Sequence, residues 1–564
     1  PELFTDNPDW GGGKRDGATL TLPPLDSQET AELLMGQAGK SVMPARTQQA
    51  LLERSGGNPL YVTELMRLVA EQGMTDFTGE EAGLPLPDTV QAIIAARLDL
   101  LDDEHRAMLQ VASVIGRVFW AGALGFLGAG DAEEISSAVR ALVARELIRP
   151  VRRSSMKGQD EYTFAHVLIR DVAYGQLTRP ERARLHREVA RWLEATSGER
   201  VMDAAELVAH HHLQALELEP TEDEQRLGQV YRFVMMAGER VQALDADRGA
   251  FFYTKAAELA RTPRDRGRAL LAYGQIVVGH IDEGARALEE AAAAFREAEA
   301  PLHEADALAA RAGLEWYRGD ADASDHYDEL ALTMVEGLEP SEIVARVIAG
   351  RAAHLQLRGR SEEGLEMADR AIAVAQQVGS TENYVRGLSA RANALLALGD
   401  PSAEEDLREA LRISLDRNDT RAAIVAYNNL ATNVVVAGRL IEGKELIEEA
   451  IEYGDQRGYE LAADWSRNTR CEALFPLGEW DDALAVARHL YEADHARGGS
   501  QISTFAAAWQ AIVLFFRGSV GEARRLWVEV LDSARRGKDA QGLFPALALG
   551  TVIWEATGET AEAR

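Results

Sequence analysis

Apolar residues recur at helical spacing along most of the chain, and this recurrence restarts at a nearly fixed interval. In a representative unit, an apolar run ends at a glycine, as in residues 391–399, and a short acidic turn opens a second run. The terminating glycines are separated by 40, 40, 40, 39, 40, 40 and 40 residues: Gly279, Gly319, Gly359, Gly399, Gly438, Gly478, Gly518 and Gly558. A period of this length predicts a solenoid of stacked helical hairpins.

A series of alanines keeps the same period: Ala291, Ala331, Ala371, Ala410 and Ala450. The single short step falls in the same place in both series, so the two markers belong to one repeating unit. Two helices of about 16 residues with two turns fill this unit, and each helix is roughly 24 Å long. Glycine suits the end of the first helix because it accepts the left-handed conformation. The unit resembles the tetratricopeptide repeat, whose usual length is about 34 residues, with longer helices.

Ahead of the array the chain has a different organisation. The expected elements are a strand at 18–22, helices at 27–38 and 46–54, a sharp turn at 55–61, a helix at about 60–72 and a linker at 73–87. Helices are then expected at 88–101, 103–116, 119–128, 132–146, 166–177 and 180–195. Two short strands, at 147–151 and 161–164, flank a polar turn. Two strands around a polar tip, after a group of helices, indicate a winged-helix domain.

This order of elements resembles the signal-transducing STAND ATPases, which are AAA-like. The segments that carry the resemblance are 56–65, 86–97, 116–120 and 162–175. Taken together, they look most like the ATPase-plus-repeat region of bacterial proteins that carry a class III adenylyl or guanylyl cyclase domain. The resemblance covers about residues 1–200 and extends to the array only generically.

The resemblance implies a predominantly all-α fold that begins with the remnant of an α/β ATPase. The implied domains are the end of an ATPase core (1–26), a helical lid (27–75), a linker (76–87), a winged-helix domain (88–197) and a solenoid of tetratricopeptide-like repeats (198–564). In this family a nucleotide switch is closed by the lid and the winged helix.

The implied nucleotide contacts are few. The turn Gly57-Asn58-Pro59 is expected to lie against the adenine, and His166 to reach toward the ADP phosphate. Each has a purely structural alternative. The turn could simply start a helix, because proline is favoured at the first helical position, and His166 could be a core histidine.

The phosphate-binding loop of such ATPases is absent from this sequence. That loop requires Gly-x-x-x-x-Gly-Lys-Ser/Thr between a strand and a helix. The nearest string, residues 34–41, begins with Leu34 and follows a helix. Because the chain begins at Pro1 and stops at Arg564 within a repeat, we expect a fragment of a longer protein. ATP or ADP with magnesium is therefore expected only in the full-length protein, and no catalytic residue is expected here.

Charge and cysteine content exclude several classes of function. The net charge is −31, and residues 88–197 hold 15 basic and 15 acidic side chains, which argues against nucleic-acid binding. The lone Cys471 cannot form an internal disulfide, which favours a cytoplasmic location. No apolar run is long enough for a membrane span. The triplet His210-His211-His212 is not expected to bind metal, because consecutive helical residues point in different directions.

Three functions remain open. The first is the sensor region of a nucleotide-switched STAND protein, whose repeats bind a protein, peptide or small effector on their concave face and control a cyclase-type output. The second attaches the same region to a LuxR-type helix-turn-helix transcription activator. The third is a plain scaffold for protein interaction. Self-assembly is compatible with the first two.

Overall fold

The computed structural model describes residues 24–38, 55–71 and 89–558, except residues 243, 278–279, 458 and 498. The strand expected at 18–22, the helix expected at 46–54 and the repeat glycine Gly279 lie outside the described residues. By internal contacts the chain divides into two units. The first comprises Pro1–Thr196 and His211–Pro220, and the second Ser197–His210 and Thr221–Arg564. The domain boundaries expected from the sequence stay predictions.

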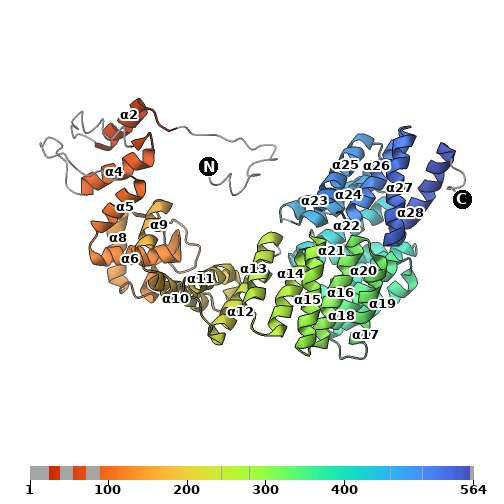
Figure 1. The fold of residues 1–564 in the computed structure, drawn as a ribbon, viewed down its shortest axis with the longest axis horizontal. Helices are drawn as coiled ribbons and strands as arrows, with labels where there is room; N and C mark the ends of the chain where they lie inside the picture. Colours follow the sequence, from red (N-terminus) through yellow and green to blue (C-terminus); the bar gives the residue numbers. More distant parts are fainter. Residues whose placement is uncertain are drawn as a thin grey trace. The chain divides into compact units, whose positions relative to one another are not determined.

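The first unit combines helices with a small sheet (Figure 1). Its helices are α2 (Ser27–Ala38), α4 (Pro59–Glu71), α5 (Val90–Asp99), α6 (Asp103–Ile115), α7 (Ala121–Phe126), α8 (Ala132–Ala144), α9 (Val167–Gln176) and α10 (Arg179–Ser197). Its strands are β1 (Val118–Trp120), β2 (Ile148–Pro150) and β3 (Glu161–Phe164). The strands form an antiparallel sheet in the order β1-β3-β2, with Phe119 opposite Tyr162 and Arg149 opposite Thr163.

The helix predicted over 119–128 is wrong at its start. Phe119 and Trp120 fall within that predicted helix, but they form β1 and pair with β3. Phe119 packs on Phe164 with ring centroids 5.5 Å apart, and Trp120 packs on Trp192 at 5.6 Å. Burial of two consecutive aromatic side chains suits the two faces of a strand. The helix α7 therefore begins only after the strand.

Two residues of the histidine triplet lie in this unit and bind α10. His211 Nδ1 lies 2.8 Å from His186 Nδ1, and His212 Nε2 lies 3.1 Å from Glu194 Oε1. The two neighbouring histidines thus reach different partners on the same helix. Among the described residues, no group of three potential ligands could hold a metal ion.

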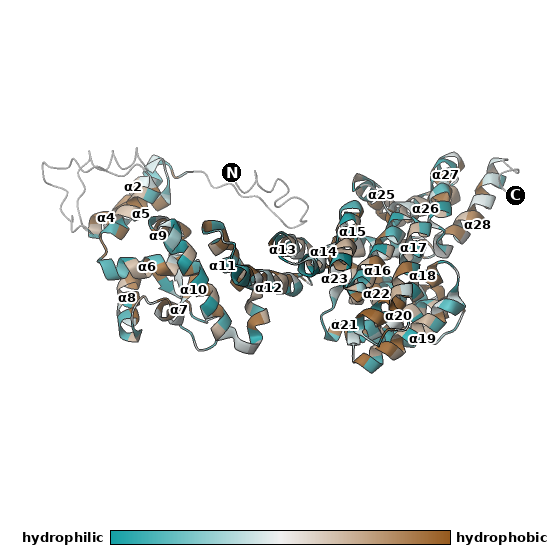
Figure 2. Cartoon of the chain, turned by 60° about the horizontal axis from the view of Figure 1, so that its bottom comes forward, coloured by the Kyte–Doolittle hydropathy of each residue, from teal (hydrophilic) through white to brown (hydrophobic). Residues whose placement is uncertain are grey.

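The second unit is a solenoid of helical hairpins. Its elements are the 3-10 helix η1 (Gly198–Ala204) and helices α11 (Ala205–Leu218, which continues into the first unit), α12 (Glu224–Val241), α13 (Ala246–Leu259), α14 (Pro263–Ile276), α15 (Ile281–Glu297), α16 (Pro301–Arg318), α17 (Ala321–Val335), α18 (Glu342–Leu357), α19 (Ser361–Val378), α20 (Thr381–Ala397), α21 (Ala403–Asp416), α22 (Thr420–Val436), α23 (Leu440–Asp455), α24 (Glu460–Leu474), α25 (Trp480–Ala496), α26 (Gln501–Phe516), α27 (Val520–Gly537) and α28 (Ala540–Thr557). Figure 2 shows teal and brown residues on different sides of many of these helices, as expected for helices that bury one face.

The repeat glycines end the first helix of each hairpin. From Gly319 to Gly558 their φ angles lie between 74° and 84°, in the left-handed region. The residue after the glycine then bonds back to the helix, as in Asp320 N to Glu315 O at 2.9 Å and Arg360 N to Leu355 O at 2.9 Å. Such bonds satisfy carbonyl groups that a helix end otherwise leaves free. The chain is therefore mainly helical, and its larger unit is an α-solenoid, as the glycine period predicts.

One set of helices stacks along the inside of the array. The even-numbered helices from α14 to α28 contact one another in succession, and we call them the inner helices. The odd-numbered helices from α15 to α27 each pack against their neighbours in sequence, and we call them the outer helices. Among the described residues, no helix is long and apolar enough to cross a membrane.

Candidate functional site

The predicted nucleotide turn forms the start of α4. Asn58 Oδ1 accepts hydrogen bonds from the N–H groups of Leu60 at 3.0 Å and Tyr61 at 3.3 Å. Pro59 is the first residue of the helix, where its missing N–H costs nothing. Asparagine followed by proline therefore makes a complete helix cap.

Gly57 is held tightly against the segment before α2. Its φ is +75°, and a Cβ atom at this position would lie 2.3 Å from the carbonyl oxygen of Leu25. Leu25 N donates to Gly57 O at 2.9 Å. Only glycine combines this conformation with so close an approach, so Gly57 fixes where the start of α4 lies.

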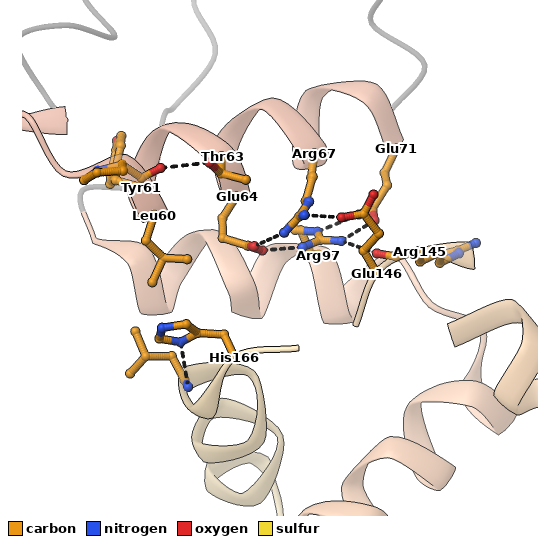
Figure 3. A network of polar contacts seen from close by, with 12 residues as sticks. Leu60, Tyr61, Thr63, Glu64, Arg67, Glu71, Arg97, Arg145, Glu146 and His166 are labelled. Carbon is orange, nitrogen blue, oxygen red and sulfur yellow. Dashed lines mark hydrogen bonds and ion pairs between the residues drawn. The ribbon is translucent and has the colours of Figure 1, made fainter. Parts of the chain in front are cut away.

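His166 caps another helix in the same unit. Its Nδ1 accepts a hydrogen bond from Leu168 N at 3.2 Å at the start of α9. In the neutral ring this places the proton on Nε2, which can donate to a ligand. In the view of Figure 3, Leu60 points from α4 toward the imidazole of His166.

These positions fit a nucleotide contact only in part. The side chain of Asn58 is used in capping α4, and Gly57 and Pro59 offer backbone alone. His166 Nε2 is the polar atom of the set that could face a phosphate group. The role of these four residues in nucleotide binding therefore stays a prediction.

A buried ion network next to this turn was not predicted from the sequence (Figure 3). Arg97 on α5 is 1% exposed and pairs with Glu64 on α4, which is also 1% exposed. Its Nε and one terminal nitrogen bind Glu71 at 3.1 and 2.7 Å, and it also donates to the carbonyl of Arg145 at 2.8 Å. Burial opposes the charge of Arg97, but the two carboxylates outweigh it and raise its pKa.

A second arginine extends the network. Arg67 on α4 binds Glu64 at 2.5 Å and also pairs with Glu146, which follows α8. The charges of α4 are thus held between α5 and the end of α8. Because a buried ion is costly without its partner, the network fixes α4 in one position against these elements.

The second candidate site is the inside of the array, which closes on itself. Three side chains at the starts of later inner helices donate to carbonyls at the ends of earlier helices. The bonds are Tyr459 Oη to Gln242 O at 2.6 Å, an Arg421 terminal nitrogen to Gln275 O at 3.1 Å, and Gln501 Nε2 to Trp316 O at 3.2 Å. Carbonyls in the last turn of a helix can accept bonds from outside the helix, and these bonds join later inner helices to the ends of earlier helices.

Further contacts reinforce this closure around α16. Trp316 Nε1 donates to Asp539 Oδ2 at 3.2 Å, and its ring lies 5.4 Å from that of Trp465. Lys538 Nζ lies 2.7 Å from the carboxylate of Asp322. Figure 1 shows the later hairpins of this unit lying beside the earlier ones. The array therefore completes a superhelical turn, and the surface of its inner helices is enclosed.

Six residues at equivalent repeat positions line this enclosed surface, and we call them the inner-face series: Asp306, Arg346, Arg386, Val425, Trp465 and Phe505. Neighbouring members touch, as in Asp306 Oδ1 to Arg346 Nε at 2.9 Å and the rings of Trp465 and Phe505 at 5.5 Å. The series is charged over α16 to α20 and apolar over α22 to α26. An enclosed surface with a charged part and an aromatic part can bind a ligand that has both characters.

Comparison with known proteins bears on the fold. No family model matches the chain, and no curated protein matches it. The chain is similar in structure to a signal transduction ATPase with numerous domains (STAND) from Pyrococcus horikoshii, which has a tetratricopeptide repeat sensor. The two are 14% identical with a TM-score of 0.50, and the match covers 93% of this chain and 77% of that chain. This match establishes a likeness of fold, namely a mainly helical chain with a helical-repeat array.

Two further solved structures match the chain in part. A Rap protein complexed with Competence and Sporulation Factor is 15% identical, with a TM-score of 0.35 and coverage of 68% of this chain and 94% of that one. Aspartyl phosphate phosphatase F from Bacillus subtilis is 12% identical, with a TM-score of 0.36 and coverage of 64% and 95%.

Proposed function

We propose that this chain is the sensor region of a nucleotide-switched signalling protein of the STAND class, and that its array binds a protein or peptide on the inner face. The observation that carries the proposal is the fold likeness to a STAND protein with a tetratricopeptide repeat sensor, which spans 93% of this chain and hence both units. The enclosed inner face of the second unit supplies the surface for the partner.

Binding of a partner can act as a signal only under one condition. The partner must bind one state of the protein more tightly than the other, because equal affinity shifts no equilibrium. Each contact that closes the array contributes only a small free energy. A partner inserted between the inner helices therefore changes the spacing of these helices. The partner's preference for one spacing is the free energy that drives the switch.

The nucleotide part of the proposal concerns ATP or ADP with magnesium in the full-length protein. The bound nucleotide supplies a phosphate charge that differs between the two states. In this chain, His166 Nε2 would donate to a phosphate oxygen, and the backbone at Gly57, Asn58 and Pro59 would lie along the adenine. The ion network of Arg97 holds α4, and with it this turn, in a fixed position.

Calorimetry on the full-length protein tests these contacts. His166→Ala removes one hydrogen bond to a charged group, so we expect ADP to bind about tenfold more weakly. Pro59→Ala loosens the turn, and we expect a smaller loss. His495→Ala, on the exposed side of an outer helix, is the matched control and should leave ADP affinity unchanged. Unchanged ADP affinity in both variants would show that this turn and His166 are not nucleotide contacts.

The proposal also concerns the output domain that the switch controls in the full-length protein. A cyclase-type output domain is our first choice, on the resemblance of residues 56–65, 86–97, 116–120 and 162–175 to cyclase-linked proteins. A LuxR-type helix-turn-helix activator would use the same sensor. Assays for cyclic nucleotide formation and for promoter binding by the full-length protein, with and without a bound partner, separate the two.

A plain interaction scaffold is the competing function. One observation favours it, because capping of α4 by Asn58 and Pro59 already explains why these residues are present. A scaffold predicts that no variant of the turn changes nucleotide affinity. The calorimetric experiment therefore decides between the two.

A further inference from the structure

The segment between β2 and β3 (residues 151–160), which we call the β2–β3 loop, carries one serine in a distinctive setting. It contains Arg152-Arg153-Ser154-Ser155, and Ser155 is the one serine or threonine of the sequence with basic side chains both two and three positions before it. Arg152, Arg153, Ser155 and Lys157 are all exposed. Among the described residues, the three cations of this loop have no ion pair. They are therefore available to a partner with acidic side chains.

Glu161 at the start of β3 holds Ser155 in place. Its Oε2 accepts hydrogen bonds from Ser155 N at 2.6 Å, from Ser155 Oγ at 2.5 Å and from Ser154 Oγ at 3.3 Å. The same oxygen accepts from Trp120 Nε1 at 3.1 Å. Burial opposes the charge of Glu161, but these hydrogen bonds outweigh it and lower its pKa. A buried, ionised carboxylate therefore lies directly against the hydroxyl group of Ser155.

Few other bonds keep the β2–β3 loop in shape. No N–H group of residues 152–158, all of which the structure describes, donates to a backbone carbonyl. The N–H groups of Ser155 and Met156 bind the side chains of Glu161 and Ser154 instead. Segments with so few backbone hydrogen bonds open at a low cost in free energy. The loop can therefore leave the sheet and extend, as a substrate segment must in the cleft of an enzyme that modifies it.

We propose that Ser155 is a phosphorylation site for a serine kinase with an acidic substrate cleft, and that the phosphate releases the β2–β3 loop from Glu161. The Ser155 oxygen forms a bond to the terminal phosphorus of a nucleoside triphosphate, the bond from that phosphorus to the bridging oxygen breaks, and the nucleoside diphosphate leaves. The hydroxyl proton passes to a base of the kinase. Arg152 and Arg153 bind carboxylates of the cleft through charge-assisted hydrogen bonds. This inference goes beyond the proposed function, because it depends on no nucleotide or partner bound by this chain.

Phosphorylation turns the contact with Glu161 from attraction into repulsion. The Ser155 oxygen loses the proton that it donates, and the phosphate adds a charge of about −1.5 to −2 at neutral pH. This oxygen lies 2.5 Å from the carboxylate, and like charges at such a distance repel strongly where protein excludes water. Arg152, Arg153 and Lys157 offer the phosphate new partners on the exposed side of the loop.

Release of the β2–β3 loop affects the packing around it. Glu161 lies opposite Trp120 in the sheet, and Trp120 packs on Trp192 of α10. A Cβ atom at Gly122 on α7 would lie 2.1 Å from Gln159 Oε1, so the end of the loop rests against the start of α7. Movement of the loop therefore changes the contacts that restrain both β1 and α7.

Kinase assays on the purified chain test the site. One arm uses ATP and a purified serine kinase that selects arginine two and three positions before the serine, and the other uses a kinase that selects acidic residues after the serine. Fragmentation mass spectrometry locates the phosphate. We expect phosphate on Ser155 in the first arm and none there in the second. Arg152→Gln and Arg153→Gln should each lower the initial rate about tenfold, because each loses a hydrogen-bonded charge pair with the kinase.

Matched variants make the result specific. Arg149 is exposed on β2 but lies six positions before Ser155, so Arg149→Gln should leave the rate as in the parent. Ser154→Ala should keep the phosphate and Ser155→Ala should lose it, and circular dichroism shows that each variant is folded. Absence of phosphate on Ser155 in the first arm, phosphate on Ser154 in its place, or equal rates in the parent and both arginine variants would overturn the site.

Hydrogen exchange of the phosphorylated chain tests the release of the loop. We expect the amides of residues 154–161 to exchange about tenfold faster, because Ser155 loses both hydrogen bonds to Glu161. Exchange in α18–α20 should stay unchanged. Ser155→Ala removes one of these bonds without adding charge, so its effect should be smaller. Phosphate on Ser155 with unchanged exchange in residues 154–161 would overturn the inferred release.

Discussion

At the scale of single residues, Glu472 shows how the enclosed face changes side-chain chemistry. It lies on inner helix α24, near Thr432 Oγ1, which donates to its carboxylate at 3.3 Å. Burial raises its pKa from 4.5 to about 7, and this hydrogen bond only partly opposes the effect of burial. The carboxylate is therefore held in surroundings that favour its protonated form.

The raised pKa of Glu472 predicts a pH-dependent stability. The folded protein binds this proton more tightly than the unfolded chain, so the free energy of unfolding should fall as pH rises from about 4.5 to about 7. A tenfold difference in proton affinity between the two states is worth about 1.4 kcal/mol, and we expect Glu472→Gln to remove a decrease of roughly 3 kcal/mol. Urea unfolding at pH 5 and pH 8 measures it. An equal decrease in the parent and the variant would contradict the assignment.

At the scale of elements, the Arg97 network decides how firmly α4 is held. Arg97→Met leaves the buried carboxylate of Glu64 without its main partner, and we expect a destabilisation of about 3 kcal/mol. The double variant Glu64→Leu/Arg97→Met removes both charges and should recover part of that loss. Hydrogen exchange of the α4 amides reports the local effect, and thermal unfolding the global one.

An exposed arginine provides the comparison for this prediction. Arg140 on α8 binds Ser136 at 2.9 Å at an exposed position, so Arg140→Met should leave exchange in α4 unchanged. Faster exchange in α4 for both arginine variants would mean that the network does not specifically hold the helix.

The sequence predicts elements better than it predicts contacts between them. The repeat glycines and the helix start at Asn58 are visible because their causes are local: a left-handed turn and a cap. The strand at 118–120 is not, because its pairing with 161–164 depends on a partner some forty residues later. The ion pair between Glu64 and Arg97 joins residues 33 apart and carries no periodic pattern.

The residues expected to contact the nucleotide and the residues of the inner face show the same difference between local features and long-range contacts. His166 and the turn at Gly57 are named from a resemblance, and the structure shows their local capping but no ligand that would assign them. Two arginines of the inner face, Arg346 and Arg386, lie 40 residues apart, so the repeat period of the sequence relates them to each other. Helical spacing alone does not connect Arg421 to this pair. Only closure of the array brings α14, α16 and α22 together.

At the scale of the whole second unit, closure changes how stability is distributed. In an open solenoid each hairpin contacts only its neighbours, so a local change has a local effect. Here Trp316 contacts residues of hairpins far along the chain, including Asp539, 223 positions away. The segments on both sides of this contact are therefore expected to open together.

Trp316→Ala tests this coupling. It removes an aromatic pair with Trp465 and the hydrogen bond to Asp539, so hydrogen exchange should speed up both in α14–α17 and in α26–α28. Lys444→Glu is the control, because Lys444 joins α23 to Glu479 in the adjacent hairpin at 2.6 Å and should speed exchange only in α23–α25. If Trp316→Ala changes exchange in α14–α17 alone, the array behaves as an open solenoid. Coupled exchange would instead show that the closed turn is one cooperative element, which a ligand on the inner face could hold or release.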